Sequence, residues 1–315
     1  MTQQDSIAIR TDGLTRGFPG VKAVNGLSFD VKYGEIFGLV GPDGAGKTTT
    51  MRLLAGILAL DAGSAMVAGY DVTRDPEAVK HEISYMSQRF GLYEDLTVDE
   101  NIRFYGDIFG VKKKDREHKA MQLLKAADMD RFRTRLAGKL SGGMKQKLGL
   151  ICSLIHTPKV ILLDEPTNGV DPVSRRDFWK ILYSLLGEGV AILTSTAYLD
   201  EAERCHRVAL IHEGRLLFCD TPAKLKAHLK NAVVSVIAAD TRGVRDAIRS
   251  AEGVNSAMLV GDGVHLLVDD AQRRIPELRS VLTAKGVPFE SVEQATPSVE
   301  DVFVSAVEGK QETNR

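Results

Sequence analysis

A glycine-rich loop between two apolar segments constrains this 315-residue chain more than any other feature. The loop reads Gly41-Pro-Asp-Gly-Ala-Gly-Lys-Thr-Thr49. The apolar run Ile36–Val40 before it predicts a buried strand, and Thr48–Leu58 after it predicts a helix. A strand, a glycine-rich loop and a helix in this order are the context of a phosphate-binding loop.

The residue types of the loop suit a nucleotide triphosphate. Glycines allow the sharp turn that presents backbone N–H groups to phosphate oxygens, and the helix N-terminus adds its positive dipole end. Lys47 can reach the β- and γ-phosphates, and the Thr48 hydroxyl can bind Mg²⁺. A chance glycine turn with a surface lysine is the competing interpretation, which the flanking strand and helix disfavour. The predicted contacts are Gly41, Pro42, Asp43, Gly44, Ala45, Gly46, Lys47, Thr48 and Thr49.

Two acids follow the apolar run Val160–Leu163, which predicts a second buried strand. An acid at the carboxyl end of such a strand lies beside the phosphate loop. Asp164 is therefore predicted to hold Mg²⁺, and Glu165 to act as the general base that activates water. An acidic turn that merely closes a strand is the alternative, which Pro166 and a further motif upstream disfavour.

That further motif, Ser141-Gly142-Gly143, begins a predicted helix over Gly142–Ile155, 23 residues before Asp164. A helix N-terminus of this kind favours anions, but taken alone it is an ordinary helix cap. One phosphate loop needs no second anion site in the same chain. The motif therefore suits the ATP of a neighbouring subunit.

The composition is that of an ordinary globular protein, with 43% hydrophobic and 26% charged residues. A formal net charge of −1 gives no basic excess, so nucleic acid is not the expected partner.

The three cysteines form no CxxC pair, which favours a reducing compartment. Met1–Asp5 show no secretory signal, and the apolar runs are shorter than the roughly 20 residues that span a bilayer. Any membrane part is expected to come from another chain.

Strand-like and helix-like segments alternate up to about Phe218, which predicts an α/β fold with a mostly parallel sheet. The segment Thr97–Ala137 is almost entirely helical in pattern and predicts a helical insertion. The other predicted strands are at Val31, Val190–Leu193 and Val208–Ile211, and the other predicted helices are Val98–Phe109 and Val173–Leu186.

A second unit is predicted from about Lys230, with the order βαββαβ of a small α+β ferredoxin-like domain. Gly261-Asp262-Gly263 predicts a hairpin turn. The expected domains are 1–228, with a helical subdomain at about 90–156, then 229–308, and a polar tail at 309–315. The predicted elements are Val233–Ala238, Val244–Ala251, Val254–Val260, Val264–Val268, Ile275–Ala284, Val287–Val292 and Val299–Val307.

The phosphate loop, Leu-Ser-Gly-Gly and Leu-Leu-Asp-Glu-Pro, in this order, resemble the nucleotide-binding subunits of ABC transporters over Ile7 to about Leu225. The resemblance implies a P-loop NTPase core of the ABC type, with ATP and Mg²⁺, in a head-to-tail dimer. It also implies roles for Phe18 in stacking on adenine, Gln88 in sensing Mg²⁺ and the attacking water, and Asp171 at the dimer interface. A core phenylalanine, a solvated glutamine and a helix cap are the alternatives for these three residues.

Three further segments resemble the type 2 exporter branch of that family, which includes drug-resistance exporters: Phe90–Asn101, Asp171–Arg176 and Pro297–Phe303. The resemblance implies a subunit at the cytoplasmic face of the cell membrane. Its partners would be a multi-spanning permease and a second ATPase domain, in a homodimer or a heterodimer. A soluble ABC ATPase without a transport role is an alternative function, and so is a clamp that binds ATP with little turnover.

The chain departs from the family pattern at Ala197, where Ser-Thr-His is usual and Ser-Thr-Ala stands. Alanine cannot donate the hydrogen bond that histidine gives to the γ-phosphate. The loss of one oriented donor can lower a rate on the order of 10²–10³-fold. Either the chain pairs with a related subunit that keeps its own histidine, or it forms a homodimer with two slow sites. The intact Ser141–Gly143 favours the first account.

Overall fold

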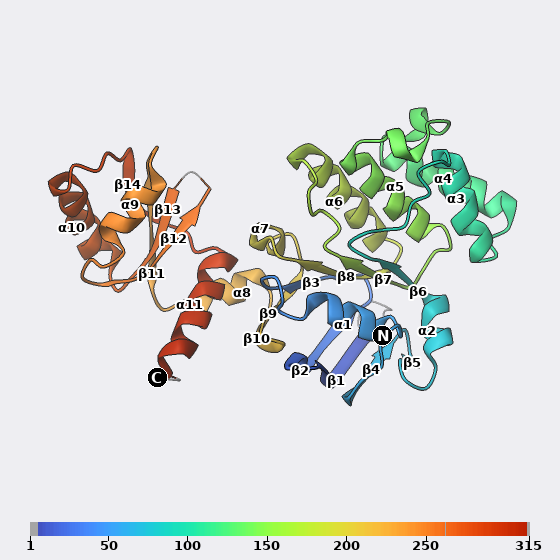
Figure 1. Cartoon of the computed structure of the whole chain (residues 1–315), viewed down its shortest axis with the longest axis horizontal. Helices are drawn as coiled ribbons and strands as arrows, with labels where there is room; N and C mark the ends of the chain where they lie inside the picture. Colours follow the sequence, from blue (N-terminus) through green and yellow to red (C-terminus); the bar gives the residue numbers. More distant parts are fainter. Residues whose placement is uncertain (1–5, 262, 314–315) are drawn as a thin grey trace. The chain divides into compact units, whose positions relative to one another are not determined.

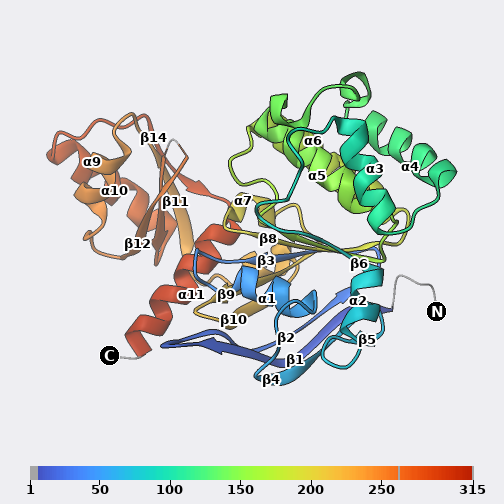
Figure 2. The same cartoon turned by 45° about the vertical axis from the view of Figure 1, so that its right-hand side comes forward.

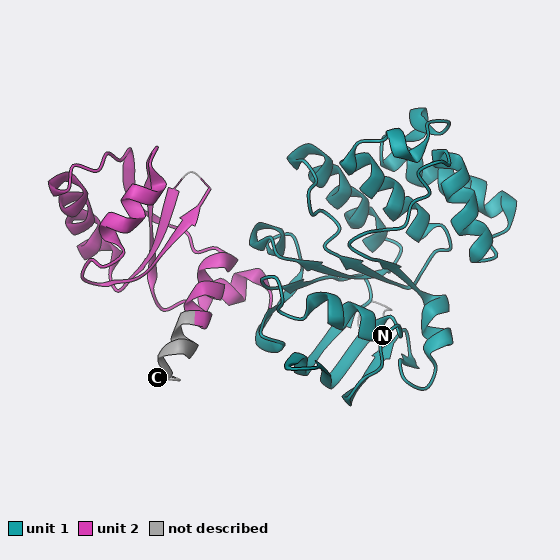
Figure 3. Ribbon diagram, viewed as in Figure 1, with its two compact units in different colours: residues 1–219 teal, residues 220–315 magenta. Residues whose placement is uncertain are grey.

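The computed structural model describes residues 6–261 and 263–313, which form two compact units divided between Cys219 and Asp220 (Figure 3). The division precedes the predicted boundary at 228, because helix α8 (Pro222–Ala227) contacts α11 (Val299–Thr313) of the second unit. The backbone of α11 is helical through residue 313, so most of the expected polar tail continues this helix. Residues 1–5, 314 and 315 lie outside the described part.

The first unit is built on a six-stranded sheet with the order β10-β9-β3-β8-β7-β6. The strands from β9 to β6 pair in parallel, which confirms the predicted α/β fold. Their carboxyl ends meet at one edge, where Asp164 pairs with Ser195 and Val40 with Thr196. The strands are β3 (Ile36–Val40), β6 (Ile83–Met86), β7 (Val160–Asp164), β8 (Ala191–Thr196), β9 (Arg207–His212) and β10 (Arg215–Asp220).

A second, antiparallel sheet with the order β2-β1-β4-β5 was not predicted from the sequence, apart from a strand around Val31. Register shifts interrupt the pairing of β1 with both β2 and β4. Each shift breaks the alternation of apolar and polar residues by which a strand is predicted. The strands are β1 (Ile7–Phe18), β2 (Val21–Lys32), β4 (Ala62–Val67) and β5 (Tyr70–Asp71).

Helix α1 (Lys47–Leu54) lies between the two sheets and shares one core with both (Figures 1 and 2). Its side chains Met51, Leu53 and Leu54 are fully buried in that core. The sequence predicts this helix through Leu58, but it ends at Leu54. Gly56 follows in the left-handed conformation, with φ of 64°, which ends a helix at little steric cost.

The helical insertion lies on the other face of the central sheet (Figure 2). It contains α3 (Val98–Ile108), which begins with a capping box formed by Thr97 and Glu100. Because α5 packs against both α3 and α6, the Ser-Gly-Gly motif at its start is carried by a layer of packed helices. The remaining helices of this unit are α2 (Pro76–Glu82), α4 (Lys113–Ala126), α5 (Gly142–Leu154), α6 (Pro172–Leu186) and α7 (Leu199–Ala202), with 3-10 turns at Asp130–Phe132 and Ala137–Lys139.

The second unit has the predicted βαββαβ order, and its antiparallel sheet has the ferredoxin-like order β12-β13-β11-β14. The last strand was predicted at Val287–Val292, and this prediction is wrong, because Ser291–Ala295 forms the ladder with β11. Asp262 of the predicted hairpin lies outside the described residues. The elements are β11 (Ala232–Ile237), α9 (Thr241–Ile248), β12 (Val254–Val260), β13 (Gly263–Val268), α10 (Ala271–Ala284) and β14 (Ser291–Ala295).

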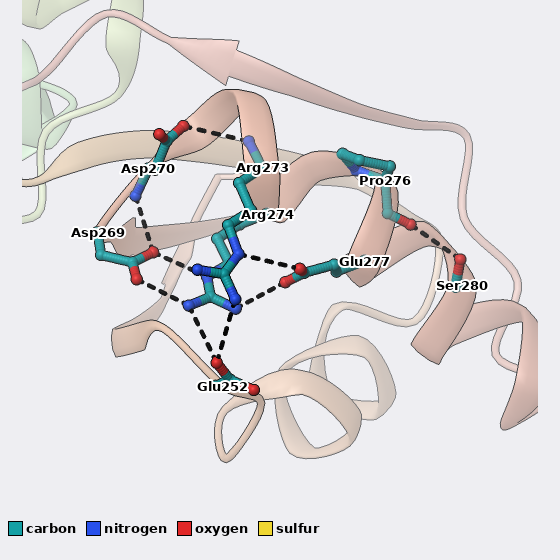
Figure 4. A network of polar contacts seen from close by, with 8 residues as sticks. All are labelled: Glu252, Asp269, Asp270, Arg273, Arg274, Pro276, Glu277 and Ser280. Atoms are coloured by element: carbon teal, nitrogen blue, oxygen red, sulfur yellow. Dashed lines mark hydrogen bonds and ion pairs between the residues drawn. The ribbon is translucent and has the colours of Figure 1, made fainter.

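A buried arginine joins the end of β13 to the start of α10 (Figure 4). The guanidinium of Arg274 donates two hydrogen bonds of 2.8 Å to the carboxylate of Asp269 and one of 2.7 Å to Glu277. These hydrogen bonds from Arg274 hold the pKa of Asp269 well below its usual value. A Cβ atom at Gly253 would lie 2.0 Å from Nε of Arg274, so any larger residue there would displace the guanidinium from its carboxylates.

A histidine–aspartate pair attaches α11 to the sheet of the second unit. His265 alternates with the core residues Val264 and Leu266 on β13, so its side chain faces away from that core. Its Nδ1 lies 3.2 Å from Oδ1 of Asp301, which is fully buried. The hydrogen bond to Asp301 raises the pKa of His265. Burial raises the pKa of Asp301, but the bonds from His265 and Ser298 outweigh it and lower that pKa overall.

The second unit is expected to lose stability as the pH rises through the raised pKa of His265. The contribution of His265 is fully present below about pH 6.5, its pKa in the unfolded chain. The lowered pKa of Asp301 adds stability above about pH 3.9, which is lost as the pH falls through the native value. Both contributions are therefore present from about pH 4 to 6.5.

Urea unfolding at pH 6 and pH 8 checks this expectation. Far-UV circular dichroism follows both units, while the fluorescence of Trp179, the single tryptophan, follows the first unit alone. The midpoint of the second unit should be lower at pH 8, and His265→Gln should remove most of the difference. An equal pH dependence in wild type and variant would contradict the assignment.

Candidate functional site

The glycine-rich loop connects β3 to α1 at the carboxyl edge of the central sheet. Gly46, which precedes α1, has φ of 100°, and a Cβ atom there would lie 2.1 Å from the carbonyl oxygen of Ala23. A Cβ atom at Gly41 would lie 2.2 Å from the carbonyl oxygen of Ile211. No side chain caps the first turn of α1, so its backbone N–H groups can bind an anion.

The ammonium of Lys47 is folded back over this loop, and the side chain is only 4% exposed. Its Nζ donates hydrogen bonds of 2.8 Å to the carbonyl of Gly41 and 3.0 Å to that of Pro42. It also lies 3.0 Å from Oε1 of Glu165. The loop therefore holds a buried positive charge at the position predicted for the β- and γ-phosphates.

Thr48 and Asp164 meet at the start of α1 and the end of β7. The Thr48 hydroxyl donates a 3.0 Å hydrogen bond to Oδ1 of Asp164, and the hydroxyl of Ser195 on β8 donates another of 2.8 Å to the same oxygen. The role of Ser195 was not predicted from the sequence. Its only signal in the sequence is its position two residues after the predicted strand Val190–Leu193, which in the structure pairs with the strand before Asp164.

Glu165 is held in a left-handed conformation, with φ of 48°, by hydrogen bonds from its N–H to the backbone and side-chain oxygens of Ser195. A non-glycine residue in this conformation stores strain, which is common at functional sites. Its Oε2 accepts hydrogen bonds from Nε2 of Gln88 at 3.1 Å and Nδ2 of Asn168 at 3.4 Å. The carboxylate is thus fixed from both sides, by Lys47 and by two amides.

A cavity of about 560 Å³ extends from this carboxylate to the end of β1. Phe18 lies at its rim, 43% exposed, so it is not a core phenylalanine. The Arg16 guanidinium lies 5.3 Å from the centre of the Phe18 ring. The cavity is lined by Phe18, Val21, Ala23, Asp43, Gly44, Gly46, Lys47, Thr48, Thr49, Gln88 and Glu165.

Ser141, Gly142, Gly143 and Asp171 do not line this cavity but lie together elsewhere on the unit. The side chain of Ser141 caps α5, and that of Asp171 caps α6 by accepting from two backbone N–H groups. A Cβ atom at Gly143 would lie 3.3 Å from Oδ2 of Asp171, so the two helix starts are adjacent. The hydrogen bond from the Ser174 N–H holds the pKa of Asp171 below its usual value.

Comparison with known proteins identifies the family. The family model described as "ABC transporter" matches residues 24–168. The daunorubicin resistance ATP-binding protein DrrA2 of Streptomyces coeruleorubidus is 35% identical over 305 residues, which are 95% of each chain. This chain belongs to the ABC transporter family of ATP-binding proteins.

Other ABC proteins match the chain as well. The probable multidrug ABC transporter ATP-binding protein YbhF of Escherichia coli is 43% identical over 306 residues, which are 96% of this chain but only 52% of that relative. A solved ATP-binding subunit of an ABC transporter, 28% identical, superposes with a TM-score of 0.64 over 70% of this chain and 92% of its own. The chain thus spans about half the length of YbhF, whereas the matched fold covers 92% of the solved subunit.

The donors of this ABC site fit Mg²⁺ that arrives with a phosphate chain. Mg²⁺ in proteins usually takes one or two carboxylates and completes its shell with water and phosphate oxygens. Asp164 supplies a carboxylate that is 1% exposed, and Thr48 supplies a hydroxyl bonded to it.

No helix within residues 6–261 and 263–313 has the length and apolar character needed to cross a bilayer.

Proposed function

We propose that this chain binds and hydrolyses ATP to drive a membrane exporter. The observation that carries the proposal is the contact of 3.0 Å between Lys47 and Glu165, beside the hydrogen bond between Thr48 and Asp164. These contacts bring a phosphate-binding lysine, a candidate base and a metal site to one cavity. The relatives support export as the process, because their names include multidrug transport, daunorubicin resistance and Nod factor export.

The roles follow from the chemistry of each side chain. Lys47 and the N–H groups of the loop bind the phosphates, and the exposed ring of Phe18 stacks on adenine. Thr48, Asp164 and Gln88 hold Mg²⁺, which supplies positive charge that offsets the charge of the triphosphate when bound. Glu165 accepts a proton from the attacking water, and its amide neighbours keep the carboxylate oriented.

A second ATPase domain is needed to complete the site. Within one chain Ser141–Gly143 and Asp171 lie apart from the cavity, so they can serve the ATP of a partner. A head-to-tail pair would close over ATP and open after hydrolysis, because the γ-phosphate contacts both partners. A multi-spanning permease would use this motion, with the chain bound peripherally at the cytoplasmic face of the membrane.

Ala197 leaves a second candidate function, a clamp that binds ATP but turns it over slowly. Because Ala197 cannot donate a hydrogen bond, turnover by the purified chain alone is expected to be slow. Ala197→His should raise it on the order of 10²-fold. Steady-state phosphate release measures this, with Ala227→His on an exposed helix end as the control that should change nothing.

Rapid hydrolysis by the lone chain that Ala197→His does not change would contradict the account of a slow site. The transport role is tested separately, by affinity purification of the tagged chain from solubilised membranes. Recovery of a multi-spanning permease supports the exporter. Recovery of the chain only from the soluble fraction would favour an ABC ATPase without a transport role.

A further inference from the structure

Resting on the proposed function, we propose that Tyr198 is a positioning residue for Glu165 and acts through the amide of Asn168. Tyr198 follows Ala197 directly, at the start of α7, and Asn168 lies in the loop between β7 and α6. The Tyr198 hydroxyl donates a 3.2 Å hydrogen bond to Oδ1 of Asn168. The Nδ2 of Asn168 in turn donates to Oε2 of Glu165 at 3.4 Å.

The carboxylate of Glu165 sets the orientation of the amide, and the hydroxyl of Tyr198 secures it. An amide side chain can rotate by 180°, which exchanges its acceptor oxygen and its donor nitrogen. A carboxylate only accepts hydrogen bonds, so Nδ2 of Asn168 faces Glu165, and the Tyr198 hydroxyl, which can donate or accept, donates to the amide oxygen on the other side. Without that hydroxyl the amide oxygen loses its hydrogen-bond donor, so the side chain of Asn168 is held less firmly beside the carboxylate.

The ring of Tyr198 is itself held in place. The guanidinium of Arg175 stacks on the ring at 4.5 Å from its centre, a cation–π contact. Arg175 also lies 3.6 Å from the buried carboxylate of Glu201 and 3.8 Å from that of Asp200. The N–H of Tyr198 donates to the Thr196 hydroxyl at 2.9 Å.

Together these contacts form a path from α6 and α7 to the catalytic carboxylate. The Glu165 oxygen that Asn168 contacts is the one that also accepts from Gln88, while Lys47 contacts the other oxygen. A bound triphosphate would compete with Glu165 for the ammonium of Lys47. The amides of Gln88 and Asn168 then keep the Glu165 carboxylate oriented, and Tyr198 holds the amide of Asn168 in place. This gives a site with alanine at position 197 a further group that orders its base.

Tyr198→Phe tests the proposal, because phenylalanine keeps the ring on Arg175 and removes only the hydroxyl. The loss of one such hydrogen bond is expected to lower kcat about 3- to 10-fold with the KM for ATP unchanged within about twofold. Tyr183→Phe is the matched control, since the Tyr183 hydroxyl donates at 2.9 Å to the Arg204 carbonyl outside the site and the residue is 41% exposed. This control should leave both constants unchanged.

A double-mutant cycle separates action through Asn168 from a general structural effect. In the Asn168→Ala background, Tyr198→Phe should have no further effect on kcat. Equal losses in both backgrounds, a change in KM alone, or no change in kcat would overturn the proposal. If the wild-type chain hydrolyses ATP no faster than the Glu165→Gln variant does, the proposed function is overturned as well. The two failures are therefore distinguishable.

Discussion

Glu165→Gln is expected to lower ATP turnover by about 10²–10⁴-fold and to leave ATP binding intact. Glutamine has the size of glutamate but cannot accept a proton from water at neutral pH. Its amide oxygen can still face Lys47, which lies 3.0 Å from Oε1 of Glu165, so the loop that binds phosphate should keep its shape. Phosphate release and ATP titration on the same sample measure the two properties.

The matched control for this variant is Glu188→Gln. Glu188 is also paired with a lysine, since its Oε2 lies 2.9 Å from Nζ of Lys119, but it is remote from the cavity. Turnover should not change in this control. If Glu165→Gln retains turnover within about threefold of wild type, Glu165 is not the general base.

Local patterns predicted those parts of the fold and site that depend on short segments. The strand, loop and helix around Lys47 adjoin in sequence, so their order alone places the phosphate loop at a sheet edge. The acids Asp164 and Glu165 end the strand that was predicted before them. The structure places Glu165 and Gln88 in the cavity that Lys47 lines, and places Asp164 behind it, bonded to Thr48.

Contacts between distant segments were not predictable in this way. Ser195 bonds to Asp164 and to the N–H of Glu165 only because β7 and β8 are paired, and 31 positions separate Ser195 from Asp164. Asn168 and Tyr198 likewise meet across 30 positions. The sheet of β1, β2, β4 and β5 was missed for a different reason, since its register shifts disrupt the period-two pattern.

The last strand of the second unit shows how a local signal can mislead. Val287 and Phe289 resemble the start of a strand, but they pack against the core from the preceding loop. The ladder with β11 starts only at Ser291, where Val292 lies opposite Val236. A strand with one buried valine and polar neighbours has a weak sequence signal, whereas the backbone pairing that defines it is not visible in sequence.

Lys47→Ala is expected to weaken ATP binding about 10- to 100-fold, because a hydrogen bond to a charged group contributes about 1.5–3 kcal/mol. The ammonium is buried against the carbonyls of Gly41 and Pro42, so its position is fixed before a ligand binds. AMP has neither β- nor γ-phosphate and should bind equally well to wild type and variant. Lys159→Ala is the control, since Lys159 forms a 2.9 Å ion pair with Glu82 outside the cavity.

We propose that Lys47, Thr48, Asp164 and Glu165 surround the phosphates of ATP with Mg²⁺. Titration of Mg·ATP and of AMP into wild type, Lys47→Ala and Lys159→Ala measures whether Lys47 contacts the β- and γ-phosphates. A loss of ATP affinity in Lys47→Ala alone, with AMP affinity unchanged, is the predicted result. Equal ATP affinity in Lys47→Ala and wild type would contradict the claim.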